Sequence, residues 1–83
     1  MESRVAIIAI IVENRESHDA IATINEHLHE SAEYIIGRMG LPYKQKDVSI
    51  ISIVMDAPQD IISALSGKIG RIEHVQVKTV YSK

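Results

Sequence analysis

The sequence of 83 residues contains no cysteine, and this absence removes several kinds of chemistry at once. Without a thiol the chain has no disulfide, no thiolate ligand for a metal and no cysteine nucleophile. Aromatic residues are scarce as well, with three tyrosines and neither phenylalanine nor tryptophan. The core must therefore be built from aliphatic side chains, and a small core of this kind is often supplemented by association of subunits.

The sequence has neither an excess of basic residues nor a long apolar run. Its formal net charge is −2, so no positive field predicts direct binding to nucleic acid. The longest apolar run, Val5–Val12, is too short to span a bilayer. It is also a poor signal peptide, because only Arg4 precedes it as a basic residue and polar residues 13–16 follow it. We therefore expect one cytoplasmic domain, residues 1–83, without membrane association.

The second half of the chain predicts a strand, a helix and a strand. Residues 48–55 form an apolar, β-branched run that is typical of a buried strand. We expect residues 56–58 to end it, with Pro58 at the first helical position and Gly70 as a left-handed helix stop. From Val75 to Tyr81 apolar and polar residues alternate, which is the period of a half-buried strand. Four apolar residues mark the buried face of the helix, namely Ile61, Ile62, Leu65 and Ile69.

The first half of the chain predicts the same elements. Val5–Val12 is apolar on both faces, as a central strand would be. Ser17 is expected to cap a helix, which ends between Glu30 and Gly37. We interpret Tyr34–Tyr43 as an edge strand, because it contains a proline and prolines are confined to the edges and ends of sheets. Residues 44–47 then form a polar turn. The buried stripe of the helix is predicted to comprise Ile21, Ile24, Leu28 and Ala32.

This order predicts an α+β, ferredoxin-like βαββαβ domain: a four-stranded antiparallel sheet with two helices on one face. The first and third strands would be central and the second and fourth would be edges. The uncovered face would then expose aliphatic residues, and a contiguous apolar face is seldom left in water. We therefore expect a homo-oligomer, a dimer or a tetramer, that packs sheet on sheet or joins sheets edge to edge.

The polar link between the first strand and the first helix is the predicted ligand site. Its four candidate residues bring hydrogen-bonding side chains to a helix start, whose positive end favours anions. Arg15 offers a forked donor for a carboxylate or phosphate, and His18 would make binding pH-dependent. A plain connection without a ligand is the alternative. The candidates are Asn14, Arg15, Ser17 and His18.

Other candidate chemistries have less support. His27 and His29 project about 200° apart on a helix, so they cannot hold one ion together. A metal site using them or His74 would need ligands from different elements or different subunits. Residues 66–70 look like a phosphate loop, but they end a helix where such a loop would begin one. The sequence therefore predicts no catalytic residue, no metal site and no cofactor.

Several segments carry a resemblance to known proteins. Val12–Arg15 before a helix is similar to ACT-type regulatory domains, although Glu16-Ser17 replaces their usual Pro-Gly pair. Together with Arg38–Pro42, Ile62–Gly70 and Val75–Val80, the segment Val12–Arg15 resembles the iron-only hydrogenase system regulators. Members of that family are small ACT-like bacterial proteins, similar to the C-terminal effector domain of nickel-responsive repressors.

The resemblance implies a regulatory, oligomeric domain that acts in transcriptional regulation and catalyses nothing. The nickel site of the repressors is not carried over, because this chain lacks their cysteine and their histidine pattern. Only four residues precede the first strand, so we expect any effect on transcription to pass through another protein. Two functions are open: a regulatory domain that binds a small anionic ligand at a subunit interface, and an assembly partner in metalloenzyme maturation without a ligand of its own.

Overall fold

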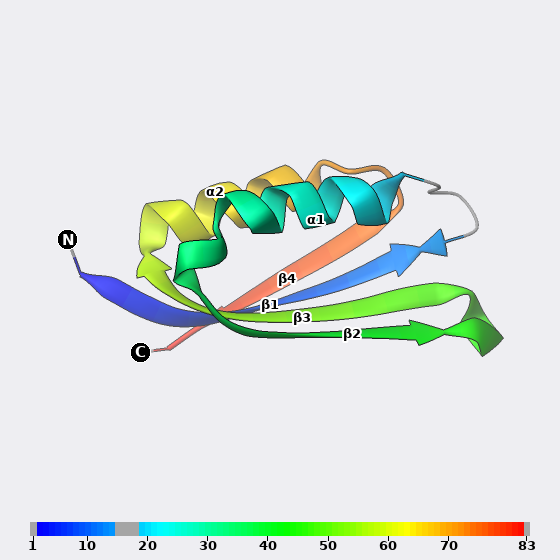
Figure 1. The fold of residues 1–83 in the computed structure, drawn as a ribbon, viewed down its shortest axis with the longest axis horizontal. Coiled ribbons are helices and arrows are strands. Elements are labelled where there is room, and N and C mark those ends of the chain that lie inside the picture. Colours follow the sequence, from blue (N-terminus) through cyan, green and yellow to red (C-terminus); the bar gives the residue numbers. More distant parts are fainter. Residues whose placement is uncertain (1, 15–18, 83) are drawn as a thin grey trace.

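The computed structural model describes residues 2–14 and 19–82 and confirms the predicted order of elements (Figure 1). The four strands form one antiparallel sheet in the order β2-β3-β1-β4, and both helices cover the same face of it. No helix in the described part of the chain is long and apolar enough to cross a membrane. The elements are β1 (Ser3–Glu13), α1 (Ala20–Glu30), β2 (Ile35–Tyr43), β3 (Val48–Pro58), α2 (Gln59–Gly70) and β4 (Val75–Tyr81), with short 3₁₀ turns η2 (Ala32–Tyr34) and η3 (Lys44–Lys46).

The central position of β1 and β3 is confirmed. The two strands pair along their whole length, from Ser3 opposite Pro58 to Glu13 opposite Val48. β2 pairs with β3 and β4 pairs with β1, so the strands predicted to be edges lie at the two edges of the sheet. A register shift between Ile35 and Gly37 forms a bulge at the start of β2.

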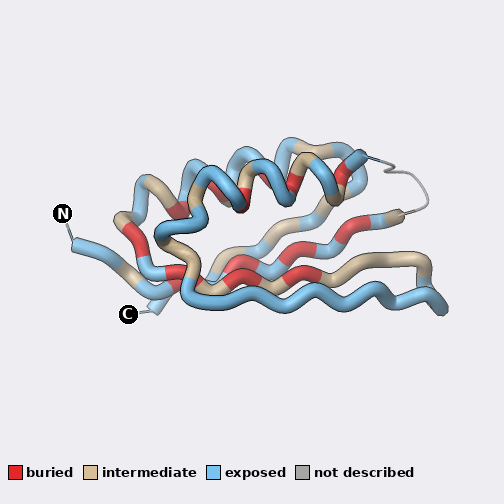
Figure 2. Tube along the Cα trace, in the orientation of Figure 1, coloured by how far each residue is buried: buried red, intermediate tan, exposed pale blue. Residues whose placement is uncertain are grey.

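The core lies between the sheet and the helices. Every second residue is buried against the helices from Ala6 to Val12 in β1 and from Ile51 to Ala57 in β3, which gives the alternating pattern seen in Figure 2. Fully burying one such aliphatic side chain contributes about 1.5–3 kcal/mol to stability. The buried residues are Ala6, Ile8, Ile10, Val12, Ala20, Ile24, Leu28, Ile51, Ile53, Met55, Ala57, Ile62, Leu65 and Ile69.

Three predicted details of the helices and strands were wrong. Residues 56–58 continue β3 instead of ending it, because β1 extends back to Ser3 and offers them partners. Pro58 keeps an extended ψ of 146°, so it precedes α2, which begins at Gln59. Ala32 is exposed in η2, because α1 has already ended at Glu30.

The expected left-handed stop at Gly70 was also wrong. Gly70 is the last residue of α2, and no described glycine has a positive φ. The helix ends with backbone bonds instead: Arg71 N–H donates to the carbonyl of Gly67, and Ile72 N–H donates to that of Ile69. The chain turns into β4 through a left-handed residue further on, His74, whose φ is 66°.

Candidate functional site

Of the predicted ligand site, only Asn14 belongs to the described residues; Arg15, Ser17 and His18 lie outside them. The side-chain carbonyl of Asn14 accepts a hydrogen bond of 3.0 Å from the hydroxyl of Ser49. Its backbone N–H donates to the carbonyl of Asp47 at 3.1 Å. Asn14 thus fastens the end of β1 to the start of β3. The structure leaves the anion site at this loop as a prediction.

A hollow of about 160 Å³ lies between α1 and the inner side of β2. Ser49, the partner of Asn14, is one of its lining residues. A second hollow of about 280 Å³ continues along α1. Arg38 and Asn25 line both hollows, and the guanidinium of Arg38 donates to the Asn25 side-chain carbonyl at 2.9 Å. Together they form a groove with apolar walls and one charged group.

Neither Arg38 nor Asn25 is among the residues that the sequence predicts for the ligand site. Arg38 stands between Gly37 and Met39 in an otherwise uncharged strand, so a cation at this position was a usable signal. Asn25 gave no such signal, because a polar residue on the outer part of a helix is ordinary. A guanidinium beside apolar walls can hold a small carboxylate that has an apolar body.

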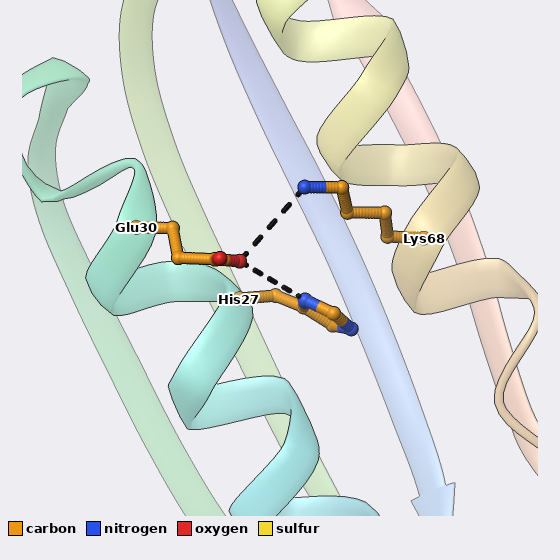
Figure 3. A network of polar contacts seen from close by, with 3 residues as sticks. All are labelled: His27, Glu30 and Lys68. Carbon is orange, nitrogen blue, oxygen red and sulfur yellow. Dashed lines mark hydrogen bonds and ion pairs between the residues drawn. The ribbon is translucent and has the colours of Figure 1, made fainter.

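His27 takes part in short polar contacts on the helix side of the molecule. His27 Nδ1 lies 3.3 Å from Glu30 Oε1, and Lys68 Nζ of α2 approaches the same oxygen at 3.8 Å (Figure 3). This network links α1 to α2 at the surface, where such pairs contribute at most about 1 kcal/mol. No group of three or more potential ligands that could hold a metal ion is found among residues 2–14 and 19–82.

The uncovered face of the sheet, called the open face below, is broad and apolar. On β1 it carries Ile7, which is 43% exposed, and on the edge strands it carries Met39 at 57% and Val80 at 65%. The strand register aligns its side chains in rows across all four strands. The three full rows are Gly37–Val54–Ile7–Val80, Met39–Ser52–Ala9–Lys78 and Leu41–Ile50–Ile11–Gln76.

The polar residues of the open face lie mostly toward its ends and sides. Lys78 and Gln76 are on the edge strand β4, and Asp56 is opposite Val5 near one end of the face. Glu13 and Val48 pair at the other end. The interior of the open face is therefore aliphatic apart from Ser52. Such a surface matches the apolar centre and polar rim of protein–protein interfaces.

These features define a small ferredoxin-like α+β domain with an open apolar sheet face. The model of the TM1266-like family, described as "Iron-only hydrogenase system regulator, putative", matches residues 4–79. The chain belongs to this family of iron-only hydrogenase system regulators. The resemblance drawn from Val12–Arg15, Arg38–Pro42 and Ile62–Gly70 is thereby confirmed.

Solved structures agree with this assignment. The uncharacterized protein TM1266 from Thermotoga maritima is 44% identical, with a TM-score of 0.91 over 99% of this chain and 100% of that chain. The C-terminal domain of the MgtC protein from Mycobacterium tuberculosis is 12% identical, with a TM-score of 0.67 over 95% and 87% of the two chains.

A third similar structure is a formyltetrahydrofolate deformylase from Pseudomonas putida KT2440, which is 10% identical with a TM-score of 0.63 over 92% of this chain and 28% of that one. At these low identities the MgtC domain and the deformylase share only the fold with this chain. No curated protein matches the chain.

Proposed function

We propose that this chain is a non-catalytic, cytoplasmic regulatory module of an iron-only hydrogenase system and that it works as a homo-oligomer joined through the open face. The observation that carries the proposal is the apolar open face. Its central strands β1 and β3 are eleven residues long, and Val5, Ile7 and Ile11 are each more than 40% exposed. Exposing them to water is unfavourable by about 25 cal/mol for each Å² of apolar surface, and this cost drives association.

The regulatory part of the proposal is supported by the family to which the chain belongs. The formal net charge of −2 gives no overall excess of basic residues that would favour direct binding to DNA. Any action on transcription would then be exerted through a partner protein that recognises the assembled module. The alternative is an assembly partner in metalloenzyme maturation, which would use the same apolar surface without binding a ligand.

Sedimentation velocity at micromolar concentration tests the oligomer. The wild type should sediment as a dimer or tetramer, and Ile7→Glu should shift it to a monomer because a carboxylate would be buried without a partner. Ala64→Glu is the matched control, since Ala64 is exposed on α2 at the opposite side of the molecule. A wild-type protein of 9.2 kDa in solution would refute the proposal.

Binding of a small anionic ligand is a second candidate function. The groove between α1 and β2 favours it, because Arg38 lies there beside apolar walls and Ser49 connects the groove to Asn14. Calorimetric titration with short-chain carboxylates and with phosphate tests this function in the wild type, Arg15→Ala and Arg38→Ala. Arg71→Ala serves as the control for loss of one exposed positive charge.

The pattern of loss assigns the site. Binding that disappears with Arg15→Ala would place the ligand at the loop, as the sequence predicts. Binding that disappears with Arg38→Ala would place it in the groove. A competing histidine site is tested by Ni²⁺ or Zn²⁺ titration of His27→Ala/His29→Ala. Absence of any ligand in all forms would favour the assembly partner.

A further inference from the structure

We propose that the occupant of the open face is a second copy of this chain, related by a two-fold axis that runs parallel to the strands. In this arrangement β1 lies over the partner's β3, and β2 lies over the partner's β4. The inference rests on the proposed homo-oligomer and goes further, because it states which strands face each other. It follows from four properties of the open face: its area, its central row, its charged edge, and a neighbouring row that ends in Val80 and Gly37.

The area of the open face favours full overlap of the two copies. Four strands spaced about 4.8 Å apart, with about 3.3 Å per residue from Val5 to Glu13, give a projected area of about 500 Å² per subunit. A specific interface needs about 1,000 Å² in total from both partners. An off-centre contact would bury less of this area and leave aliphatic side chains in water. We therefore expect the two sheets to be centred on each other.

The centre of the open face suits such an overlap. Its middle row places the small side chains of Ala9 and Ser52 on the two central strands. On either side of them lie larger pairs, Ile7 with Val54 and Ile11 with Ile50. A shallow centre between two aliphatic ridges allows two copies to approach and interdigitate, as the inner faces of a β-sandwich do. A symmetry axis through this centre keeps both ridges buried.

If the strands of the two sheets are aligned, as in a β-sandwich, the two-fold axis has two orientations, and Lys78 distinguishes them. Lys78 and Met39 occupy the two outer ends of the middle row. With the axis perpendicular to the strands, Lys78 would face the partner's Lys78, and like charges facing each other are unfavourable. With the axis parallel to the strands, Lys78 would face the partner's Met39. The lysine stem could then pack on the methionine while its ammonium group reaches the rim.

The neighbouring row favours the same orientation. Val80 and Gly37 lie at its two outer ends, and Val80 is 65% exposed. At Gly37, space for a Cβ is open, with no atom within 4 Å of it. A parallel axis would set Val80 over the partner's Gly37, so that a protruding side chain meets a gap. A perpendicular axis would set Val80 over the partner's Gln76.

The absence of native cysteine allows a clean crosslinking test. Met39→Cys and Lys78→Cys would be prepared separately and refolded alone or mixed, then treated with a bismaleimide too short to cross the sheet. The parallel axis predicts crosslinked dimers only in the mixture, because equivalent cysteines would lie three strand spacings apart, about 14 Å laterally. Glu26→Cys, on exposed α1, controls for random collisions.

Each other result has a distinct meaning. Crosslinking of either variant alone, as efficient as in the mixture, would indicate the perpendicular axis and overturn this inference. If neither substitution crosslinks in an oligomer confirmed by sedimentation, the interface lies elsewhere, which overturns the inference but keeps the oligomer. If either substitution dissociates the oligomer, Leu41→Cys and Gln76→Cys are mixed instead. The parallel axis predicts crosslinking in this mixture, and an oligomer that gives none overturns the inference. A monomeric wild type would overturn the proposed function itself.

Discussion

The backbone carbonyl of His74 accepts a hydrogen bond of 3.1 Å from the N–H of Glu13, and His74 makes this contact in a left-handed conformation with φ of 66°. The contact joins the end of β1 to the residue just before β4. The left-handed residue between α2 and β4 is therefore not a glycine, and a left-handed conformation is costly for such a residue. The strand pairing of β1 with β4 compensates for that cost.

The strain at His74 predicts a clear order of stability among its variants. His74→Gly should raise the free energy of unfolding by about 1 kcal/mol, because glycine adopts positive φ without a Cβ clash. His74→Val should lower it by about 1 kcal/mol or more, since β-branched residues resist this conformation. His74→Asn is the control, as asparagine tolerates it. Urea unfolding measures the order; equal stability of the glycine and valine variants would contradict the strain.

The helical glycines of α2 predict the opposite behaviour. Gly67 and Gly70 are exposed, and a Cβ added at either has no atom within 4 Å. Gly67→Ala should stabilise the protein by about 0.5–1 kcal/mol, because alanine loses less conformational entropy in a helix. Gly70→Ala should be neutral or stabilising as well. Thermal unfolding checks both predictions. A marked loss of stability in Gly70→Ala would contradict the right-handed conformation of Gly70 at the end of α2.

Arg4 predicts a local effect on the ends of the chain. Its guanidinium donates to the Gln59 side chain at 2.8 Å and to the Ser82 carbonyl at 2.7 Å, and it lies 4.7 Å from the Tyr81 ring centroid. Arg4→Lys should lose the forked geometry and cost about 1 kcal/mol. Hydrogen exchange at the amide of Ser82, which bonds the Val5 carbonyl, should become faster. Unchanged exchange would show that Arg4 does not hold the C-terminal strand.

The link between Ser49 and Asn14 predicts measurable coupling. Ser49→Ala leaves the partly buried side-chain carbonyl of Asn14 without the donor seen at 3.0 Å, which should cost about 1 kcal/mol. A double-mutant cycle with Asn14→Ala should give a coupling energy of at least about 0.5 kcal/mol. Additive effects would mean that the two residues act independently. The side-chain oxygens of Ser66 and Thr79 are also 3.0 Å apart, so a second double-mutant cycle on this pair gives a coupling energy for comparison.

The fold could be predicted from the sequence because its signals are periodic and agree with one another. The aliphatic runs of β1 and β3 marked central strands, and the alternation in Val75–Tyr81 marked a half-exposed edge. The ends of the elements were harder to predict. Pro58 and Gly70 are local signals, but strand pairing with Ser3 and helix-end backbone bonds decided where β3 and α2 stop.

The candidate site was less accessible to sequence reasoning. The groove beside Arg38 exists because α1 leaves the inner side of β2 uncovered. The spacing of residues in the sequence does not specify the distance between two elements that a turn connects. The open face was predictable in outline, since a one-sided sheet must expose half of each central strand. Its rows were not, because they depend on the register among four strands that are distant in sequence.

The bulge between Ile35 and Gly37 has a consequence for how many copies can gather. A regular, exposed edge strand offers an unpaired row of backbone groups, to which further chains can add without limit. In β2 the bulge interrupts this row at one end, and Pro42 near the other end has no N–H to offer. Growth by adding strands is thereby discouraged, whereas stacking through the open face ends once that face is covered. The irregular edge thus favours a closed assembly of defined size over a fibre.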